Sequence, residues 1–319
     1  MGSRLATDEE VETWRNDGWV LIEGLISTDE IDATVDDLKK MFPTNEDYQA
    51  DPEGVTAKWK GHPLKVEDAF VWPEDGPGFR PEQQNWSTKF PFPGKGALNR
   101  LCVHPSLIDF AERALDTHDV RLYQIHATTK YEGETNYEQP MHTDRNHSWL
   151  PPSRKAPWWN LEGFLYMTDV TGGENPTRLV SVRDTQRISP EFPVVMPSYA
   201  PDFYEAERPA IGVRGSYLAY RSDVFHRGAA FGSRGTSRTT LALAFRHWEH
   251  RWIGYDESQS QATGREWIRF VERSTPRELE LFGFPVPGHQ IWDEQLIDDT
   301  QMRYPKLDLD PWRKALSGG

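Results

Sequence analysis

The sequence predicts a mainly β protein with flanking helices. Between residues 120 and 250 it consists of short runs rich in β-branched and aromatic residues, separated by turn residues. Helical signals lie before residue 42 and after residue 263. Runs spaced in this way are typical of an antiparallel sandwich or a small barrel. No internal repeat or low-complexity tract divides the chain, so we expect one domain over residues 1–319.

The N-terminal region, residues 1–42, is predicted to form a helix, a loop and a second helix. Thr7 and Glu10 have the spacing of a capping box, in which each side chain caps the backbone of the other residue. A short apolar run, GWVLIEGLI, follows this helix. Ser27 or Thr28 is expected to begin the second helix. Its apolar positions are Ile31, Val35, Leu38, Met41 and Phe42.

Residues 43–97 are rich in Pro, Gly, Asp and Trp and show little periodicity. An irregular stretch of this length inside a compact domain usually has a function, so it is predicted to be a lid or a binding loop. Large aromatic side chains here and near the later motifs are candidates for pocket walls, although packing in the core is the commoner fate of a tryptophan. The candidates are Trp72, Trp86, Phe90, Trp149, Trp158 and Trp159.

Five runs make up the predicted β core, at about residues 120–250. They are VRLYQIHATTKY, WNLEGFLYMTDV, TRLVSV, GSYLAYRSDVFH and RTTLALAFRHW. The C-terminal segment, residues 263–319, is predicted to contain a helix and then to wrap the surface. Pro276 suits the first turn of that helix, and Gly283 suits its end.

The charge of the chain excludes one class of partner. The 319 residues contain 36 Lys and Arg against 50 Asp and Glu, which gives a formal net charge of −14. An acidic field repels polyanions, so nucleic acid is not expected as a partner. We find no signal peptide and no apolar run of 18 residues, which predicts a cytoplasmic protein without a membrane segment. Cys102, the one cysteine, is expected to be a small buried side chain.

The motif QPMHTDRNHSW indicates a metal site. Residues i and i+2 of a strand project from the same face about 7 Å apart, so His142 and Asp144 can direct an imidazole nitrogen and a carboxylate at one point. A histidine and a carboxylate are two of the three ligands of the facial triad that holds non-haem Fe(II). The best candidate for the third ligand is His226, 82 residues beyond Asp144 at the end of GSYLAYRSDVFH. This separation is natural in a jelly roll, where distant strands lie side by side.

An arginine after the third histidine suits an anionic co-substrate. Arg238 begins a β-rich run twelve residues beyond His226. Its guanidinium could bind a dicarboxylate through a bidentate pair while the other end of that molecule chelates iron. Arg234 also follows His226, but RTTLALAF alternates like a terminal barrel strand and favours Arg238.

Four other histidines are weaker candidates for the site. His147 follows the metal motif across a polar turn, and a structural role is expected more often than contact with substrate. His126 alternates with Gln124 on one strand face, so it either faces the interior of the barrel or makes a structural hydrogen bond. His247 and His250 have no third ligand after them, so a separate zinc site is not expected there.

Several of these segments resemble the phytanoyl-CoA dioxygenase family of Fe(II)- and 2-oxoglutarate-dependent oxygenases. EEVETWRNDGWVLIEGLISTDEI resembles the family's N-terminal helix and the turn after it. FLYMTDVTGGENPTRLVSVRDT is similar to the family's strand, Thr-Asp turn and Asn-Gly-Pro-Thr segment, but it lacks the Pro-Gly-Ser-His element that follows. GSYLAYRSDVFHRG resembles the strand that leads to the family's distal histidine.

The resemblance implies a double-stranded β-helix, which is a cupin-like jelly roll, and a set of site residues. The residues implied for Fe(II) are His142, Asp144 and His226, and those implied for 2-oxoglutarate are Arg238, Gln124 and Lys130. Family members that halogenate lack the acidic ligand. The presence of Asp144 therefore favours hydroxylation, or a related oxidation, of a small molecule by O2.

Two other functions are compatible with the residues alone. A jelly roll can bind a small molecule without catalysis, and a cupin-like isomerase or hydrolase can use the same His, Asp and His ligands without O2. Members of the resembled family act on acyl-CoA thioesters, amino acids and natural products. The chain is acidic and shows no basic cradle for a coenzyme A phosphate, which favours a small secondary metabolite. The sequence predicts no oligomeric state.

Overall fold

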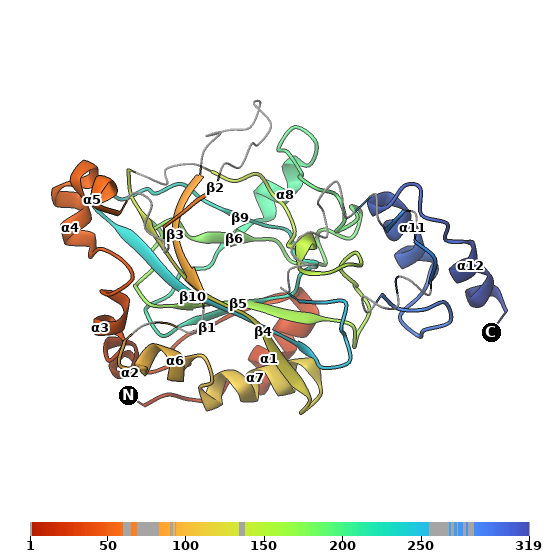
Figure 1. Cartoon of the computed structure of the whole chain (residues 1–319), viewed down its shortest axis with the longest axis horizontal. Coiled ribbons are helices and arrows are strands. Elements are labelled where there is room, and N and C mark those ends of the chain that lie inside the picture. The colour runs from red at the N-terminus through yellow and green to blue at the C-terminus, as the bar shows by residue number, and fades with distance from the viewer. Residues whose placement is uncertain are drawn as a thin grey trace.

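The computed structural model contains two antiparallel sheets (Figure 1). Residues of both sheets line a cavity between them. It describes residues 2–59, 65–68, 83–89, 92, 94–133, 138–254, 268, 271–272, 274–276, 279 and 284–318. Within these residues the larger sheet has seven strands and the smaller sheet has three. Helices lie along the outer side of the larger sheet and at both ends of the molecule. This arrangement is a jelly roll, and it confirms the predicted fold class of a β core with flanking helices.

The larger sheet has the strand order β1-β8-β5-β10-β4-β3-β2. Its strands are β1 (Trp19–Ile22), β2 (Lys65–Asp68), β3 (Gln83–Lys89), β4 (Val120–Tyr131), β5 (Asn160–Tyr166), β8 (Tyr217–Tyr220) and β10 (Ser237–His247). The register of β4 and β10 places Lys130 opposite Arg238 and His126 opposite Ala242. Directly opposite residues project from the same face of a sheet. The two cations predicted to bind 2-oxoglutarate are therefore neighbours on one wall.

The smaller sheet has the strand order β7-β6-β9. Its strands are β6 (Thr177–Leu179), β7 (Arg208–Pro209) and β9 (His226–Gly228). An isolated β-bridge between His142 and His226 extends this sheet. The backbone N–H of His142 donates to the carbonyl of His226 at 3.0 Å, and the reverse hydrogen bond is 2.8 Å long. Two residues that are far apart in the sequence thus become neighbours.

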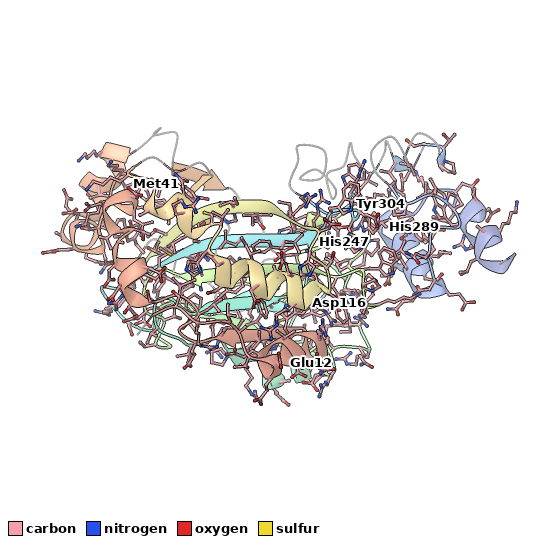
Figure 2. All side chains as sticks on the ribbon, turned by 90° about the horizontal axis from the view of Figure 1, so that it is seen from below. Glu12, Met41, Asp116, His247, His289 and Tyr304 are labelled. Carbon is pink, nitrogen blue, oxygen red and sulfur yellow. The ribbon has the colours of Figure 1, made fainter. Side chains whose placement is uncertain are left out.

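The outer face of the larger sheet carries the main hydrophobic core. Leu241 and Phe245 on β10 belong to this core, whereas Ala242 between them lines the cavity. Helices α1 (Asp8–Asp17) and α7 (Pro105–Leu115) cover the outer face, as the view from below in Figure 2 shows. Helix α7 was not among the elements predicted from the sequence. The alternation along β10 therefore separates an apolar side under the helices from a side that faces the smaller sheet.

The N-terminal region agrees in part with its prediction. Helix α1 begins with the predicted capping box, in which the Thr7 hydroxyl accepts from the N–H of Glu10 and the Glu10 carboxylate accepts from the N–H of Thr7. The helix ends at Gly18, which has a φ of 84°. The next apolar run forms strand β1 because it pairs with β8 at the sheet edge, so the prediction of helix, loop and helix is wrong there. Two short helices follow, α2 (Thr28–Asp32) and α3 (Val35–Leu38).

The described part of residues 43–97 is not the irregular lid that its composition predicts. Helices α4 (Asn45–Ala50), α5 (Pro52–Trp59) and α6 (Ala97–Leu101) accompany β2 and β3. Strand β3 pairs with β4, and Trp86 on it is 0% exposed in the main core, so Trp86 is not a pocket wall. The prediction failed because QQNWSTK lacks apolar alternation, and its pairing depends on a strand distant in sequence. Trp72 and Phe90 lie outside the described residues.

The C-terminal segment packs at one end of the molecule (Figure 1). Its helices are α11 (Glu294–Arg303) and α12 (Asp310–Ser317). They contribute to a second hydrophobic cluster that also contains Trp149 and Trp158. These two candidate pocket walls therefore pack against the C-terminal segment, the commoner fate of a tryptophan, and do not line the cavity between the sheets.

Four other predicted residues can be placed or excluded. Trp159 packs edge-on against a neighbouring tryptophan, with 5.8 Å between the ring centroids. It does not line the cavity between the sheets, but it lines a separate pocket together with Arg154 and Arg221. Cys102 is buried, as predicted. Pro276 is helical, and Gly283 lies outside the described residues. Helix α8 (Pro201–Ala206) is a further helix that the sequence did not predict.

Candidate metal centre

The structure brings the three predicted metal ligands together. His226 begins β9, His142 forms the bridge opposite it, and Asp144 lies two residues after His142. One possible ligand atom from each residue lies within 4.8 Å of the other two. The sequence placed His142 and Asp144 on a regular strand, but pairing stops at the bridge and Asp144 precedes the short helix η1 (Arg145–His147). The convergence therefore depends on the bridge to β9 and not on strand alternation.

Backbone carbonyls orient both imidazole rings. Nδ1 of His142 lies 2.9 Å from the carbonyl of Pro140, and Nδ1 of His226 lies 3.1 Å from the carbonyl of Val224. A carbonyl only accepts, so each Nδ1 carries the proton and each Nε2 has its lone pair available for a metal ion. Nε2 of His226 lies 3.7 Å from Oδ2 of Asp144.

The surroundings also set the protonation of the possible ligands. Burial, with the nearby His226, lowers the pKa of His142 to about 4. Burial alone would raise the pKa of Asp144, but His226, His147 and His142 hold that pKa below its ordinary value. At neutral pH His142 is therefore neutral and Asp144 is ionised. These are the forms in which the two side chains bind a metal ion.

A cavity of about 230 Å³ lies beside the three residues, between the two sheets. Ligand pockets commonly measure roughly 300–1,000 Å³, so the space next to the metal ligands suits compact molecules. Both sheets contribute to its lining, which is largely polar. Apart from the possible metal ligands, the polar lining includes Gln124, His126, Lys130, Gln139, Glu162 and Arg238.

One end of the cavity carries two cationic side chains. Arg238 is 6% exposed and lies opposite Lys130. The Nη1 group of Arg238 donates to the backbone carbonyl of Asn175, which has a left-handed φ of 53°. Burial and the charge of Arg238 lower the pKa of Lys130 to about 7. Arg234 is exposed in a turn and does not line the cavity, in agreement with the register that favours Arg238.

Gln124 and His126 line the cavity further along β4. Nε2 of Gln124 lies 3.1 Å from Nδ1 of His126, so the two side chains are hydrogen-bonded to each other. His126 thus faces the interior, one of the two alternatives left open by the sequence. Gln124 lies opposite Ala244, six residues along β10 from Arg238. This placement separates Gln124 from the cationic end, which weakens the expectation that Gln124 contacts the same co-substrate carboxylate.

Among the cavity residues that the sequence interpretation missed, two lie next to the metal ligands. Glu162 on β5 and Tyr220 on β8 lie opposite each other, and both are buried. The Tyr220 hydroxyl donates to Oδ2 of Asp144 at 2.7 Å, which fixes that carboxylate. The available signal was the acidic residue inside the apolar run WNLEGFLY, because a buried carboxylate is unfavourable unless it has partners.

His147 also lines the cavity, although a structural role was the commoner expectation. The short helix η1 turns its side chain back towards β5, where Nδ1 lies 2.7 Å from Oε1 of Glu162. Burial lowers the pKa of His147, but the carboxylates of Glu162 and Asp144 outweigh burial and raise this pKa to about 8.

A buried arginine of the C-terminal segment holds the loop after Asp144. Nη2 of Arg303 lies 2.6 Å from the carboxylate of Glu191. The same guanidinium donates to the carbonyls of Ser148 and Arg145, at 2.6 Å and 2.8 Å. Helix α11 therefore does more than wrap the surface, because it fixes the backbone on which the acidic ligand is placed.

A second group of histidines lies where the larger sheet adjoins the C-terminal segment. Figure 2 shows His247 and His289 near each other in this region. The ring of His250 stacks between those of His247 and Trp252, at centroid distances of 4.9 Å and 5.1 Å. Nδ1 of His250 is buried and has no hydrogen-bond partner among the described residues. Burial lowers the pKa of His250 to about 3, so this ring is neutral.

Comparison with solved structures defines the class of fold. The chain is similar to the epimerase SnoN in complex with Fe3+, alpha ketoglutarate and nogalamycin RO, with 16% identity and a TM-score of 0.52 over 75% of this chain and 82% of that chain. It is also similar to SnoK, a non-haem alpha ketoglutarate dependent carbocyclase from nogalamycin biosynthesis, with 18% identity and a TM-score of 0.50 over 77% and 87%. The chain is similar as well to EctD from S. alaskensis, with 15% identity and a TM-score of 0.50 over 80% of this chain and 85% of that chain.

Likenesses at these identities show the fold, which is one found among non-haem 2-oxoglutarate-dependent enzymes. Comparisons with protein families and with curated proteins find no match. Membership of the phytanoyl-CoA dioxygenase family therefore stays a prediction. Among the described residues no helix is long and apolar enough to cross a membrane.

Proposed function

We propose that this protein is an Fe(II)- and 2-oxoglutarate-dependent oxygenase that hydroxylates, or otherwise oxidises, a C–H bond of a small organic molecule. The observation that carries the proposal is the convergence of His142, Asp144 and His226, with ligand atoms within 4.8 Å of one another, beside a cavity. Two imidazoles and one carboxylate with open positions are the donor set of the non-haem Fe(II) facial triad. The residues present therefore fit Fe(II).

The cofactor and co-substrate would supply the oxidising power, and the substrate, 2-oxoglutarate and O2 would be converted to the oxidised product, succinate and CO2. The protein's own residues bind and orient. Arg238 presents a planar fork of N–H donors that suits the distal carboxylate of 2-oxoglutarate, and Lys130 adds a second donor beside it. The carbonyl of Asn175 holds Arg238 in place. Placement of both sheets around the cavity limits the access of water to the reacting groups.

Hydroxylation is the expected outcome, and the related structures show which other outcomes need to be distinguished. SnoN is described as an epimerase and SnoK as a carbocyclase. Hydroxylation transfers an oxygen atom from O2 to the product, whereas epimerisation and cyclisation do not. Mass spectrometry of the substrate-derived product formed under 18O2 separates these outcomes, because that product gains the heavy oxygen only if it is hydroxylated.

The test of the proposed function is O2-dependent formation of succinate from 2-oxoglutarate with added Fe(II). His142→Ala and Asp144→Ala are expected to abolish it and to abolish Co(II) binding measured by visible absorption. His118→Ala is the matched control, since the side chain of His118 is 96% exposed. Turnover at the wild-type rate in both ligand variants would remove the metal assignment.

The same assay separates the two alternative functions. A jelly-roll binding protein would form no succinate under any condition. A cupin-like isomerase or hydrolase would convert its substrate without O2 and without 2-oxoglutarate. The proposed function requires both.

A further inference from the structure

Glu162 is a carboxylate in the cavity that neither metal binding nor 2-oxoglutarate binding explains. It lies in the middle of β5, is 1% exposed, and lines the cavity. A buried carboxylate is strongly unfavourable unless hydrogen bonds or opposite charges compensate for its lost hydration. The partners of Glu162 therefore indicate which of its lone pairs remain available.

Three donors converge on one oxygen of Glu162. The Tyr123 hydroxyl, Nδ2 of Asn160 and Nδ1 of His147 all donate to Oε1. The Ser222 hydroxyl donates to Oδ1 of Asn160 at 2.6 Å and fixes that amide. Among the described residues no hydrogen bond reaches Oε2 of Glu162. This oxygen is left as an acceptor for a molecule in the cavity.

The strand register places Glu162 away from the end expected to bind 2-oxoglutarate. Phe164 on β5 pairs with Ala242 on β10. The same register brings Glu162 beside Ala244, six residues along β10 from Arg238, which corresponds to about 20 Å of strand. A five-carbon dicarboxylate that joins the metal to Arg238 is too short to reach Glu162 as well.

Glu162 is nevertheless next to the metal ligands. Its neighbour on β8 is Tyr220, whose hydroxyl donates to Asp144 at 2.7 Å. Its partner His147 lies in the turn that follows Asp144. A molecule held by Oε2 of Glu162 would therefore lie beside the metal, on the side away from Arg238.

The charges in the cavity favour a neutral donor. The cavity lining already contains the basic side chains of Lys130, His147 and Arg238 beside Asp144 and Glu162, and a divalent metal ion would add two positive charges. A cationic ligand would add a charge close to the metal, whereas a hydroxyl donates a hydrogen bond without one. The wall nearby is also polar, since it contains the side chain of Gln124.

We propose that Glu162 anchors the substrate through a hydroxyl group, and that this substrate is a compact polyhydroxylated molecule of the sugar or cyclitol type. The inference rests on the proposed function and adds the class of substrate. Glu162 acts here as a binding residue, with Tyr123, Asn160 and His147 as the residues that position it.

The test measures binding to the anaerobic Fe(II) and 2-oxoglutarate complex through its visible absorption spectrum. D-glucose and myo-inositol are the polyol probes, 1,4-diaminobutane is the amine probe and indole is the apolar probe. Glu162→Gln keeps an acceptor at Oε1 but replaces the acceptor at Oε2 with an N–H donor. We expect polyols to perturb the wild-type spectrum and to bind about tenfold more weakly to Glu162→Gln. The affinity for 2-oxoglutarate is expected to stay unchanged, which shows that this variant is folded.

Glu46→Gln is the matched control, since Glu46 is exposed on α4. Equal polyol affinity in wild type and Glu162→Gln overturns the inference. A wild-type spectrum that no polyol perturbs also overturns it, and a response only to diaminobutane or indole assigns a different substrate class. If the wild-type protein shows no visible absorption band with Fe(II) and 2-oxoglutarate, the proposed function itself is refuted instead.

Discussion

Replacement of Arg238 with alanine tests the cationic end of the cavity. Arg238 is 6% exposed, lies opposite Lys130 and is held by the carbonyl of Asn175. The pKa of Lys130 is lowered to about 7 by burial and by Arg238, so a large fraction of Lys130 is uncharged at neutral pH. Under the proposed function, Arg238 is therefore expected to be the main cation that binds the distal carboxylate of 2-oxoglutarate.

We expect Arg238→Ala to weaken 2-oxoglutarate binding by about 30-fold to 1,000-fold. Two charge-assisted hydrogen bonds of about 1.5–3 kcal/mol each are lost, or about 3–6 kcal/mol in total. Removal of the neighbouring charge raises the pKa of Lys130, and the protonated lysine then recovers part of this free energy. A net loss of about 2–4 kcal/mol, at about 1.4 kcal/mol for each factor of ten, gives the stated range.

The assay is an anaerobic titration of 2-oxoglutarate into the Fe(II)-loaded protein, followed by visible absorption. Arg238→Lys keeps the charge but lacks the planar fork, so a smaller loss is expected. Arg234→Ala, in an exposed turn, is expected to leave the affinity unchanged. An unchanged affinity in Arg238→Ala, with a melting temperature like that of the wild type, would refute the reasoning.

Three further changes test packing and protonation. Gly215→Ala is expected to lower the free energy of unfolding by about 2–5 kcal/mol, because its φ is 89° and the added Cβ would lie 2.2 Å from the carbonyl oxygen of Ile26. Gly235→Ala, with a φ of 68° and no atom within 4 Å, is expected to cost only about 1–2 kcal/mol. The pKa of His250 is lowered to about 3 in the folded protein, so below pH 6.5 the unfolded chain binds a proton that the folded protein does not. The free energy of unfolding therefore falls with decreasing pH, by at most about 1.4 kcal/mol per pH unit. His250→Gln is expected to reduce this slope. Arg303→Met breaks a buried ion pair and is expected to cost about 3–5 kcal/mol and to weaken Co(II) binding.

Urea unfolding at several pH values measures all three changes in stability. Equal losses for the two glycine variants would show that the contact with Ile26 is not limiting. An unchanged pH slope in His250→Gln, compared with His118→Gln at the surface, would assign the titration to another group. Wild-type Co(II) affinity in Arg303→Met would show that α11 does not support the metal loop.

The fold class could be predicted because its signals are local. Strand β4 has the bounds of the run VRLYQIHATTKY, in which β-branched and aromatic residues recur from Val120 to Tyr131. His142 and Asp144 could be selected from their spacing, and His226 from the resemblance of GSYLAYRSDVFHRG to a known distal-histidine strand, whereas the contact between them is long-range. Arg238 could be distinguished from Arg234 by alternation along β10, which is again a local property.

The remaining features depend on contacts between distant parts of the chain. Glu162 is a single acidic residue in an apolar strand until Tyr123, His147 and Asn160 are placed around one of its oxygens. Trp149 looks like a pocket wall from its place after the metal motif, but the C-terminal helices cover it. The residues that contact Glu162 and those that cover Trp149 leave no signal in the sequence next to either residue. These contacts could therefore not be predicted from the sequence.

The position of Arg303 has a consequence for the order in which the protein matures. During synthesis His142, Asp144 and His226 all leave the ribosome well before Arg303 is added. The loop that carries Asp144 lacks its clamp until α11 has docked against it. We therefore expect iron loading to be one of the last steps of maturation, which keeps a redox-active ion out of a nascent chain whose apolar surface is still open to oxidation.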